Sequence, residues 1–440
     1  MIMASYLRGI HTPHRKGTKN SPVISMDIPK TVTIPMAMHI GKPAVPTVKV
    51  GDLVRVGTKI GEGDGYISSN VYSSVSGKVI KLEEYLMLSG NTTTAVVIES
   101  DGEMTVDEAI APPVVTNKNE FVDAVKASGI VGLGGAGFPT YVKLNVEPEK
   151  IDYVIINGAE CEPYVTSDTV TMLTQTDDML LALKALNSYL GVKNVIIGVE
   201  SNNKKAIDSM KKLAASVSDF SVSVKVLPTV YPQGGEKVLI YHTTGRRVSS
   251  NKLPIDVGCI VLNCTTVAAI GEYLRTGMPL VKKCVTVEGG AVKKPQNVIV
   301  PIGATLQEVF DYCGGLTESP AKIVYGGPMM GITVLNTSAP ILKNTNAILA
   351  LTEKEAKLPK TTACIRCGTC LNTCPFGLAP VSIAEAYEKK NLEELNKLSA
   401  MSCMECGCCS FVCPANRPLV QLNKMAKQFI REEAKKEGCK

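Results

Sequence analysis

The chain has 440 residues, of which 45% are hydrophobic and 20% charged, and its formal net charge is +6. This length allows several domains, and this composition excludes an intrinsically disordered chain. The charge is mild and no dense Lys/Arg block is present, so no nucleic-acid partner is expected. No apolar run reaches the ~18–20 residues that a membrane span needs, and the first residues lack the apolar core of a signal peptide.

Residues 1–27 are polar and irregular, and they include His11 and His14. Two neighbouring histidines are only a weak indication of a metal site. The favoured interpretation is an N-terminal arm that packs on the surface of another domain.

Residues 28–110 predict short β-strands separated by Gly and Pro turns, as in the alternating stretch at residues 48–57. This segment resembles the barrel-sandwich hybrid domain of lipoyl and biotinyl carriers. A carrier needs a Lys at the tip of its hairpin, where this chain has Ser73, Ser74 and Val75. The expected domain is therefore a structural or docking module without a swinging arm.

Residues 117–268 alternate between helical and strand patterns. Strands are predicted at residues 153–156, 195–199, 222–227 and 260–262, and helices at residues 120–127, 177–189, 203–215 and 234–243. This alternation predicts a parallel sheet with helices on its faces. In such sheets the ligand lies beyond the carboxyl ends of the strands.

Polar residues and glycines gather at those strand ends. The candidates are Asn157, Glu160, Glu162, Tyr231, Gly234, Gly235, Glu236, Asn263 and Thr266. A glycine-rich run at residues 132–137 lets the backbone approach a phosphate and can form an anion nest, although its spacing departs from the dinucleotide fingerprint. The alternative roles are helix caps for the two Asn residues and a solvated loop position for Glu162.

Residues 269–350 return to strands, predicted at residues 284–287, 297–300 and 322–325, with a helix at residues 305–313. This segment resembles a β-grasp domain of the soluble-ligand-binding (SLBB) type. The turn-rich loop at residues 325–331 is expected to pack toward the C-terminal cysteines. Four isolated cysteines are expected to be buried apolar residues: Cys259, Cys264, Cys284 and Cys313.

Residues 355–440 hold two runs of the pattern C-x2-C-x2-C-x3-C-P, which binds cubane iron–sulfur clusters. Where two such runs occur, the fourth Cys of each ligates the other cluster. The predicted ligands of one [4Fe–4S] cluster are Cys364, Cys367, Cys370 and Cys413, and those of the second are Cys403, Cys406, Cys409 and Cys374.

Two structural zinc sites are the alternative, but zinc usually takes two separated Cys pairs rather than four ligands in one run. Cys408 is a spare thiol at the position where the first run has Thr369. Using 8 of the 15 cysteines as cluster ligands implies a reducing compartment. Residues 381–398 are helical by pattern, a final helix follows Pro418, and the charged tail from Arg431 is expected to fray.

Specific motifs carry a family resemblance. The segment Gly134-Gly-Ala-Gly-Phe-Pro-Thr140 with Lys143, and the segment Asn157-Gly-Ala-Glu160-Cys-Glu162-Pro163, resemble the flavin site in the NADH-binding subunit of respiratory complex I. Residues 160–168 and 231–236 are closer still to the Rnf type. On these motifs nearly the whole chain is identified as a member of the RnfC family, whose members are subunits of the Rnf complex, a membrane-bound ferredoxin:NAD⁺ oxidoreductase.

The resemblance implies noncovalent FMN with NAD(H) as the substrate stacked above it. The implied cofactor-binding residues are Gly134, Gly137, Phe138, Lys143, Asn157, Glu160, Glu162, Gly234, Glu236, Asn263 and Thr266. Gly134, Gly137 and Lys143 would contact the FMN phosphate or ribityl, and Phe138 would stack on adenine. The chain departs from the complex I pattern at Ala159, Gly235 and Leu262, where that pattern has Asp, a second Glu and Asn.

The resemblance also implies the architecture and the partners. The expected fold is a multidomain α/β plus β chain: an arm (1–27), a barrel-sandwich hybrid (28–110), a Rossmann-like FMN/NAD(H) domain (117–268), an SLBB-type β-grasp domain (269–350) and a helical 2×[4Fe–4S] ferredoxin-like domain (355–440). The partners would be membrane-embedded and ferredoxin-type Rnf subunits, with ferredoxin reached indirectly, at the cytoplasmic face of the membrane.

In that setting the chain would pass electrons between NAD(H), FMN and the clusters as part of an ion-pumping complex. Two other interpretations remain open at this point. One is a soluble diaphorase subunit of a hydrogenase or bifurcating dehydrogenase, and the other is an iron–sulfur scaffold without flavin.

Overall fold

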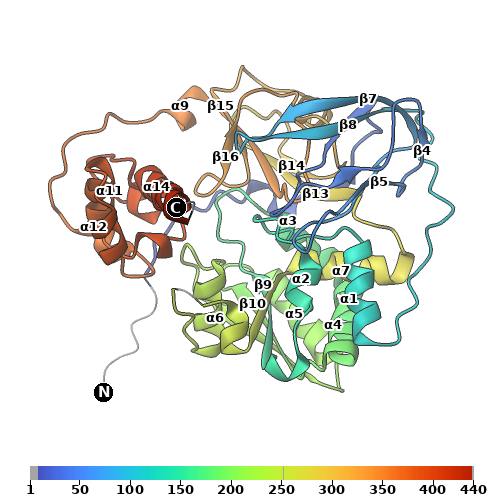
Figure 1. Ribbon diagram of the computed structural model, residues 1–440, viewed down its shortest axis with the longest axis horizontal. Coiled ribbons are helices and arrows are strands. Elements are labelled where there is room, and N and C mark those ends of the chain that lie inside the picture. Colours follow the sequence, from blue (N-terminus) through green and yellow to red (C-terminus); the bar gives the residue numbers. More distant parts are fainter. Residues whose placement is uncertain (1–7, 251, 439–440) are drawn as a thin grey trace.

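The computed structural model describes residues 8–250 and 252–438. An α/β unit and two β-rich units lie together, and a small helical unit, orange to red in Figure 1, stands beside them. A long connection after α9 (Glu353–Ala356) leads into this helical unit. Multidomain α/β plus β architecture is therefore observed, as predicted.

The α/β unit is built on a four-stranded parallel sheet. Its strands are β9 (Tyr153–Gly158), β10 (Asn194–Glu200), β11 (Ser221–Leu227) and β12 (Cys259–Asn263), in the order β11-β10-β9-β12. Its helices are α1 (Lys118–Ala127), α2 (Thr140–Leu144), α3 (Ser167–Thr174), α4 (Thr176–Leu190), α5 (Lys204–Ala215), α6 (Glu236–Thr244) and α7 (Cys264–Thr276). The predicted strands, helices and parallel pairing are all present.

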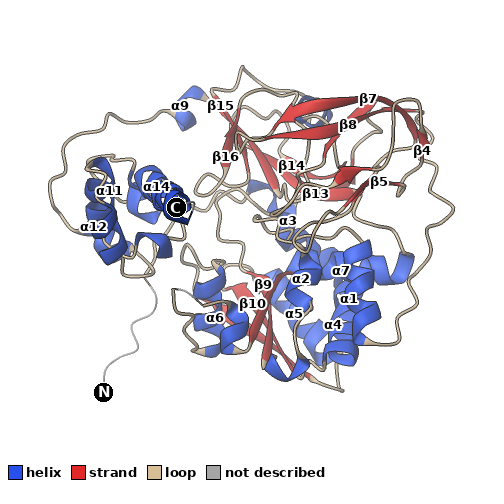
Figure 2. Ribbon diagram, viewed as in Figure 1, coloured by secondary structure: helices blue, strands red, loops and turns tan. Residues whose placement is uncertain are grey.

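Side chains that alternate along the strands fill the two faces of this sheet. Ile155 and Val261 pack on the side of α6, whereas Val154 and Ile156 belong to the larger core on the side of α4 and α7. Figure 2 shows α6 on one side of β9 and β10 and the other large helices on the opposite side. Because successive residues of a strand point to opposite faces, one apolar run can serve both cores.

The chain reverses direction across the sheet between β9 and β12. From β9 it proceeds outward to β10 and β11, and then returns to place β12 on the other side of β9. Such a switch point opens a crevice at the carboxyl ends of the two strands. Asn157 and Asn263 are register partners there.

The barrel-sandwich unit has two small sheets. One contains β2 (Thr31–Pro35), β8 (Thr92–Ser100), β7 (Gly77–Leu86) and β4 (Leu53–Val54), and the other β3 (Val45–Pro46), β5 (Lys59–Glu62) and β6 (Val71–Tyr72). Ser73 and Ser74, at the position of a carrier Lys, are buried, and Ser74 Oγ donates to the carbonyl oxygen of Ile302 at 2.5 Å. This hairpin tip is therefore buried against the β-grasp unit, to which Ile302 belongs.

The β-grasp unit has a six-stranded sheet. Its order is β1 (Val23–Ser25), β14 (Gln296–Pro301), β13 (Lys282–Glu288), β17 (Ala347–Leu351), β15 (Lys322–Tyr325) and β16 (Ile332–Val334). Helix α8 (Leu306–Tyr312) begins at Thr305, which exchanges hydrogen bonds with Glu308 in a capping box. The strand β1 corrects the prediction that residues 1–27 are irregular, because it pairs in parallel with β14.

The helical unit contains α10 (Thr369–Thr373), α11 (Pro380–Glu388), α12 (Leu392–Lys397), α13 (Cys408–Phe411) and α14 (Leu419–Gly438). The single helical segment predicted at residues 381–398 is wrong in one respect. Lys390 has a φ of +52° and Asn391 caps α12 by accepting from the Glu394 N–H, so the segment forms two helices. The tail expected to fray from Arg431 instead continues α14 to Gly438.

Candidate functional site

Six of the predicted site residues converge at the carboxyl ends of β9 and β12. They are Gly134, Lys143, Asn157, Gly234, Glu236 and Asn263. They come from the glycine-rich loop, α2, the two strand ends and the start of α6. We call this region the open edge.

Two asparagines form the floor of the open edge. Asn157 Nδ2 donates to the carbonyl oxygen of Gly234 at 2.9 Å and thereby ties β9 to the loop before α6. Asn263 Oδ1 accepts the N–H groups of Thr265 and Thr266, at 3.0 and 3.3 Å, and so caps α7. The cap role considered as the alternative for Asn263 is therefore present.

The glycine-rich loop closes one side of the open edge. A Cβ added at Gly134 would lie 2.9 Å from the Asn263 amide nitrogen, so only glycine lets the loop lie against that side chain. A Cβ added at Gly135 would meet no atom within 4 Å, and residues 134–136 are exposed. The loop thus presents solvent-exposed backbone at the crevice, as the binding of an anionic group requires.

Lys143 and Glu236 face each other across the open edge. Lys143 Nζ lies 2.7 Å from Glu236 Oε1 and also donates to the carbonyl oxygen of Val261 at 3.1 Å. The two side chains are 32% and 40% exposed. An exposed pair of this kind contributes little to stability, about 0–1 kcal/mol, and both groups are accessible to a ligand.

Distant residues hold the glycine-rich loop in place, and of these the sequence analysis missed Lys283 and Asn344. Leu133 N donates to Thr266 Oγ1 at 2.9 Å, and the buried Lys283 donates to the Leu133 carbonyl oxygen at 3.2 Å. Asn344 Nδ2 donates to the Gly135 carbonyl oxygen at 2.6 Å. The β-grasp unit therefore shapes the loop, and no local sequence signal could have indicated this.

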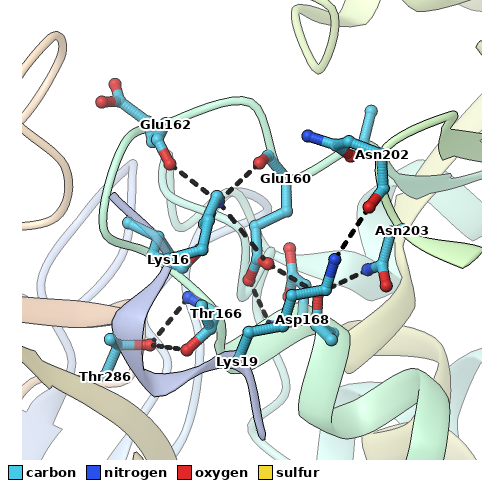
Figure 3. A network of polar contacts seen from close by, with 12 residues as sticks. Lys16, Lys19, Glu160, Glu162, Thr166, Asp168, Asn202, Asn203 and Thr286 are labelled. Carbon is cyan, nitrogen blue, oxygen red and sulfur yellow. Dashed lines mark hydrogen bonds and ion pairs between the residues drawn. The ribbon is translucent and has the colours of Figure 1, made fainter. Parts of the chain in front are cut away.

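Glu160 lies in a buried polar network (Figure 3), which reaches the open edge through Asp168, whose carboxylate accepts a hydrogen bond from Asn263 Nδ2 at 2.8 Å. Its carboxylate accepts the Asp168 N–H and the Thr169 hydroxyl, both at 2.8 Å, near the start of α3. Lys16 of the arm lies 3.7 Å from it. Burial raises the pKa of Glu160 to about 7.

Lys16 is the centre of that network. Its ammonium group donates to the backbone carbonyl oxygens of Glu160 at 2.8 Å, Glu162 at 2.9 Å and Val165. Glu200, at the end of β10, is 3% exposed, and burial raises its pKa to about 7 as well. The arm thus covers the carboxyl ends of β9 and β10, and we call this region the closed edge.

The Glu162 carboxylate points away from Lys16 and Glu160 (Figure 3). It accepts the N–H groups of Met329 and Met330, at 3.0 and 2.9 Å. Glu162 therefore holds the loop at residues 325–331 in place through these two hydrogen bonds. The backbone of that loop, at Met329, lies 3.1 Å from a Cβ built on Gly407, so the loop packs toward the second cysteine run as predicted.

Three further predicted residues lie in or against the glycine-rich loop: Gly137, Phe138 and Thr266. Thr266 is 1% exposed, and its hydroxyl is engaged by Leu133 N. A Cβ on Gly137 would face Asn344 and the backbone of His39, and Phe138 is half-buried with its carbonyl oxygen accepting from Gly132 N.

The two cysteine runs have the same local backbone. Arg366 and Glu405 have φ values of +56° and +61°, and each donates its N–H to the first Cys sulfur of its run at 3.4 Å. Gly368 and Gly407, at φ +75° and +81°, then begin the short helices α10 and α13. Tight turns that aim N–H groups at sulfur are what cluster ligation needs.

The structure brings the predicted ligands of the second cluster together. One cavity is lined by all four predicted ligands of the second cluster: Cys374, Cys403, Cys406 and Cys409. Cys408 lines it too. Of the predicted ligands of the first cluster, Cys370 and the partly buried Cys413 pack in one apolar cluster that also contains Cys409, while Cys367 is exposed. Within residues 8–250 and 252–438 no His/Cys/Asp/Glu group converges as for a single metal ion, and His11 and His14 are no exception.

Of the isolated cysteines, Cys259, Cys264 and Cys313 are buried as predicted, and Cys284 is partly buried. Among the described residues no helix is both long and apolar enough to cross a membrane.

Comparisons with known proteins match this arrangement along the chain. Family models match residues 4–103 (RnfC barrel sandwich hybrid domain), 125–272 (Nuo51 FMN-binding domain), 284–333 (SLBB domain) and 360–429 (4Fe-4S dicluster domain). The chain is 44% identical, over 97% of both chains, to a subunit of the Na⁺-translocating ferredoxin:NAD⁺ oxidoreductase complex of Acetobacterium woodii. It is 39% identical to the corresponding subunit of the proton-translocating complex of Clostridium ljungdahlii, over 100% of this chain and 97% of that one.

This chain belongs to the RnfC family of subunits of ferredoxin:NAD⁺ oxidoreductase complexes. A third relative, from Rhodobacter capsulatus, is 38% identical over 96% of this chain and 83% of its own length. Two solved structures of an NAD⁺-reducing [NiFe]-hydrogenase match at TM-scores of 0.50 and 0.51 with 15% and 16% identity. Those matches cover 71% and 72% of this chain and 63% and 64% of those chains, and they indicate a shared fold only.

The family assignment confirms the predicted domain types and cofactors. The FMN-binding and dicluster domains support noncovalent FMN and two [4Fe–4S] clusters over structural zinc. The residues present fit these groups. The open edge offers exposed glycine backbone and the Lys143 ammonium to a phosphate, and four of the predicted cluster ligands line one cavity.

Proposed function

We propose that this chain is the NAD(H)-facing subunit of a membrane-bound Rnf complex. It would exchange electrons between NAD(H) and, through partner subunits, ferredoxin, in a complex that moves Na⁺ or H⁺. The observation that carries this proposal is the position of the open edge beside the second cysteine run. The hydroxyl of Tyr231, three residues before Gly234, donates a hydrogen bond to the Cys406 carbonyl oxygen at 2.7 Å.

At the open edge the residues would divide the work. The exposed backbone at residues 134–136 and the ammonium group of Lys143 would hold the FMN phosphate. Asn157 and Asn263 would face the flavin and ribityl from the strand ends. Glu236, paired with Lys143 in the structure, would turn toward the nicotinamide nucleotide once the ammonium group engages phosphate.

FMN, when bound, supplies the exchange between hydride transfer and single-electron transfer, which neither NAD(H) nor a cubane cluster performs alone. The protein's own contribution is orientation. Thr266, Asn344 and Lys283 fix the glycine-rich loop, and Glu162 fixes the loop at residues 325–331 beside the second cysteine run.

The eight cysteines of the two runs would ligate the clusters in a crossed arrangement, in which the fourth Cys of each run binds the other cluster. Low-potential ferredoxins lie near about −400 mV, so electron flow from ferredoxin to NAD⁺ releases energy that membrane partners would couple to ion movement. The chain would sit at the cytoplasmic face of the membrane, held there by the other subunits.

An anaerobic visible spectrum tests the proposal. Purified chain with iron replenished is mixed with FMN, freed of excess flavin, and recorded before and after NADH is added. We expect a bound flavin spectrum that bleaches with NADH. If no FMN remains bound, the oxidoreductase proposal fails and an iron–sulfur scaffold takes its place.

Co-purification separates the Rnf assignment from the soluble diaphorase alternative. A tagged chain extracted from its own cells in mild detergent should bring membrane-embedded subunits with it. Recovery with a soluble hydrogenase or dehydrogenase partner, and no membrane subunit, would contradict the Rnf assignment.

A further inference from the structure

The two cysteine groups have unequal surroundings although their backbones match. We call Cys374, Cys403, Cys406 and Cys409 the inner quartet, and Cys364, Cys367, Cys370 and Cys413 the outer quartet. The inner quartet lines one cavity, whereas Cys367 of the outer quartet is exposed, and Ile365, which follows Cys364, is 67% exposed.

The inner quartet is packed against the rest of the molecule. One apolar cluster joins residues of four separate segments, namely Ile10 of the arm, Tyr231 of the α/β unit, Met329 of the β-grasp unit, and Cys406 with Cys408 of the second run. The first cysteine run, by contrast, contacts the arm through an exposed hydrogen bond, which Arg8 donates to the carbonyl oxygen of Leu371 at 3.4 Å.

A short loop, residues 231–235, connects the inner quartet to the open edge. At one end Tyr231 donates to the Cys406 carbonyl oxygen at 2.7 Å, and its own carbonyl oxygen lies 3.8 Å from Cys408 Sγ. At the other end Gly234 accepts from Asn157 and donates its N–H to Cys161 Sγ at 3.4 Å. Three residues span at most about 11 Å, so the loop keeps these two places close together.

Gly235 makes that contact tight. A Cβ added there would clash with Met404 Cε, which belongs to the residue after the first Cys of the second run. The outer quartet lies beyond the inner one, because α10 packs on α13 and Cys370 shares a buried cluster with Cys409. The structure therefore places the open edge, the inner quartet and the outer quartet in that order.

We infer that Tyr231 and its loop are a positioning element that docks the inner quartet against the open edge, and that the outer quartet is the one accessible to a partner from solvent. The inference rests on the proposed function for the presence of the clusters. It assigns to Tyr231 a role through the Cys406 backbone, without contact to any substrate.

Accessibility of each cluster can be measured without NADH or FMN. Full-length chain is reduced with titanium(III) citrate, and EPR power saturation is recorded with and without Dy(III)-EDTA, a soluble relaxation agent. Cys406→Ala leaves the outer cluster and Cys367→Ala leaves the inner one, and iron analysis should show that each variant has lost half of the iron. Dy(III)-EDTA should raise the half-saturation power in Cys406→Ala and leave it unchanged in Cys367→Ala.

A milder variant keeps both clusters and guards against misfolding. Tyr231→Phe removes the hydroxyl that bonds to the Cys406 carbonyl, and hydrogen bonding near a cluster tunes its potential. It should shift the midpoint potential of the cluster that is insensitive to Dy(III)-EDTA and leave the other midpoint in place. Tyr189→Phe, which removes a hydroxyl bonded to the Val115 carbonyl oxygen at 2.8 Å, should move neither.

Equal sensitivity of both clusters to Dy(III)-EDTA would overturn the inference, as would a Tyr231→Phe shift confined to the accessible cluster or shared equally by both. Absence of iron from the purified wild-type chain would instead contradict the proposed function. The two failures are therefore distinguishable.

Discussion

The carboxyl edge of the α/β sheet has two parts that carry similar polar residues but differ in solvent exposure. At the open edge, between β9 and β12, Lys143 and Glu236 remain 32% and 40% exposed. At the closed edge, between β9 and β10, Glu160 is 8% and Glu200 3% exposed beneath the arm. Strand ends alone therefore do not define a ligand site; what matters is whether the chain covers them with groups of its own.

The closed edge already contains its counter-charge. The Lys16 ammonium group lies among three backbone carbonyl oxygens and beside the Glu160 carboxylate, so its hydrogen-bonding capacity is satisfied within the protein. At the open edge the equivalent cation, Lys143, is partly exposed, so a ligand can reach its ammonium group. The closed edge should therefore govern stability, and the open edge should govern binding.

The largest expected effect is at the closed edge. Lys16→Met removes the cation from a buried pair and leaves the Glu160 carboxylate uncompensated, which should cost about 3–5 kcal/mol of unfolding free energy. Denaturant unfolding followed by circular dichroism under anaerobic conditions measures it. Lys205→Met is the matched control, because Lys205 also bonds to the arm, at Asn20 Oδ1, but is exposed. Equal effects of the two variants would contradict the contrast between the edges.

The next effect is at the open edge. Lys143→Ala and Glu236→Ala should each lower NADH-dependent reduction of an artificial acceptor at least about tenfold, because hydrogen bonds to charged groups contribute ~1.5–3 kcal/mol. Iron content should be unchanged, and stability should change by less than about 1 kcal/mol. Lys150→Ala, in the exposed pair with Glu147, serves as a control. Wild-type activity in both open-edge variants would move the flavin site elsewhere.

A smaller effect concerns pH at the closed edge. Burial raises the pKa of Glu160 to about 7, above its value of about 4.3 in an unfolded chain. The folded state then holds the proton more tightly, so this group's contribution to stability is present below about pH 4.3 and is lost as pH rises through about 7. Glu160→Gln should therefore reduce the fall in melting temperature between about pH 5 and pH 8. The control Glu103→Gln, at an exposed residue, should leave that fall in melting temperature unchanged. An unaltered fall in Glu160→Gln would contradict the raised pKa of a buried Glu160.

Much of the open edge was predictable because its signals are local. Asn157 and Asn263 each end a short buried strand, and parallel strands bring their carboxyl ends to one place. The cysteine spacing likewise depends on a tight turn that a few neighbouring residues specify. Residues whose role depends on their neighbours in sequence were therefore predicted correctly in position.

The closed edge was not predictable for the opposite reason. Lys16 meets the loop at residues 160–165 across more than 140 positions of sequence. At the open edge, the contact of Asn344 with Gly135, across 209 positions, was missed for the same reason. No periodicity records such contacts, so Glu160 was grouped with the flavin residues by motif alone. The break between α11 and α12 was missed because it depends on one residue, Lys390, in a left-handed conformation.

The most direct test of the central claim is an FMN titration of the two edges. The chain contains no Trp, so flavin emission is read without interference from indole. Cluster-containing, flavin-free chain is added to FMN, and quenching gives a Kd for wild type, Lys143→Ala and Lys16→Met at a temperature where all are folded. We predict a Kd raised at least about tenfold in Lys143→Ala and unchanged in Lys16→Met. A wild-type Kd in Lys143→Ala together with lost binding in Lys16→Met would contradict the account.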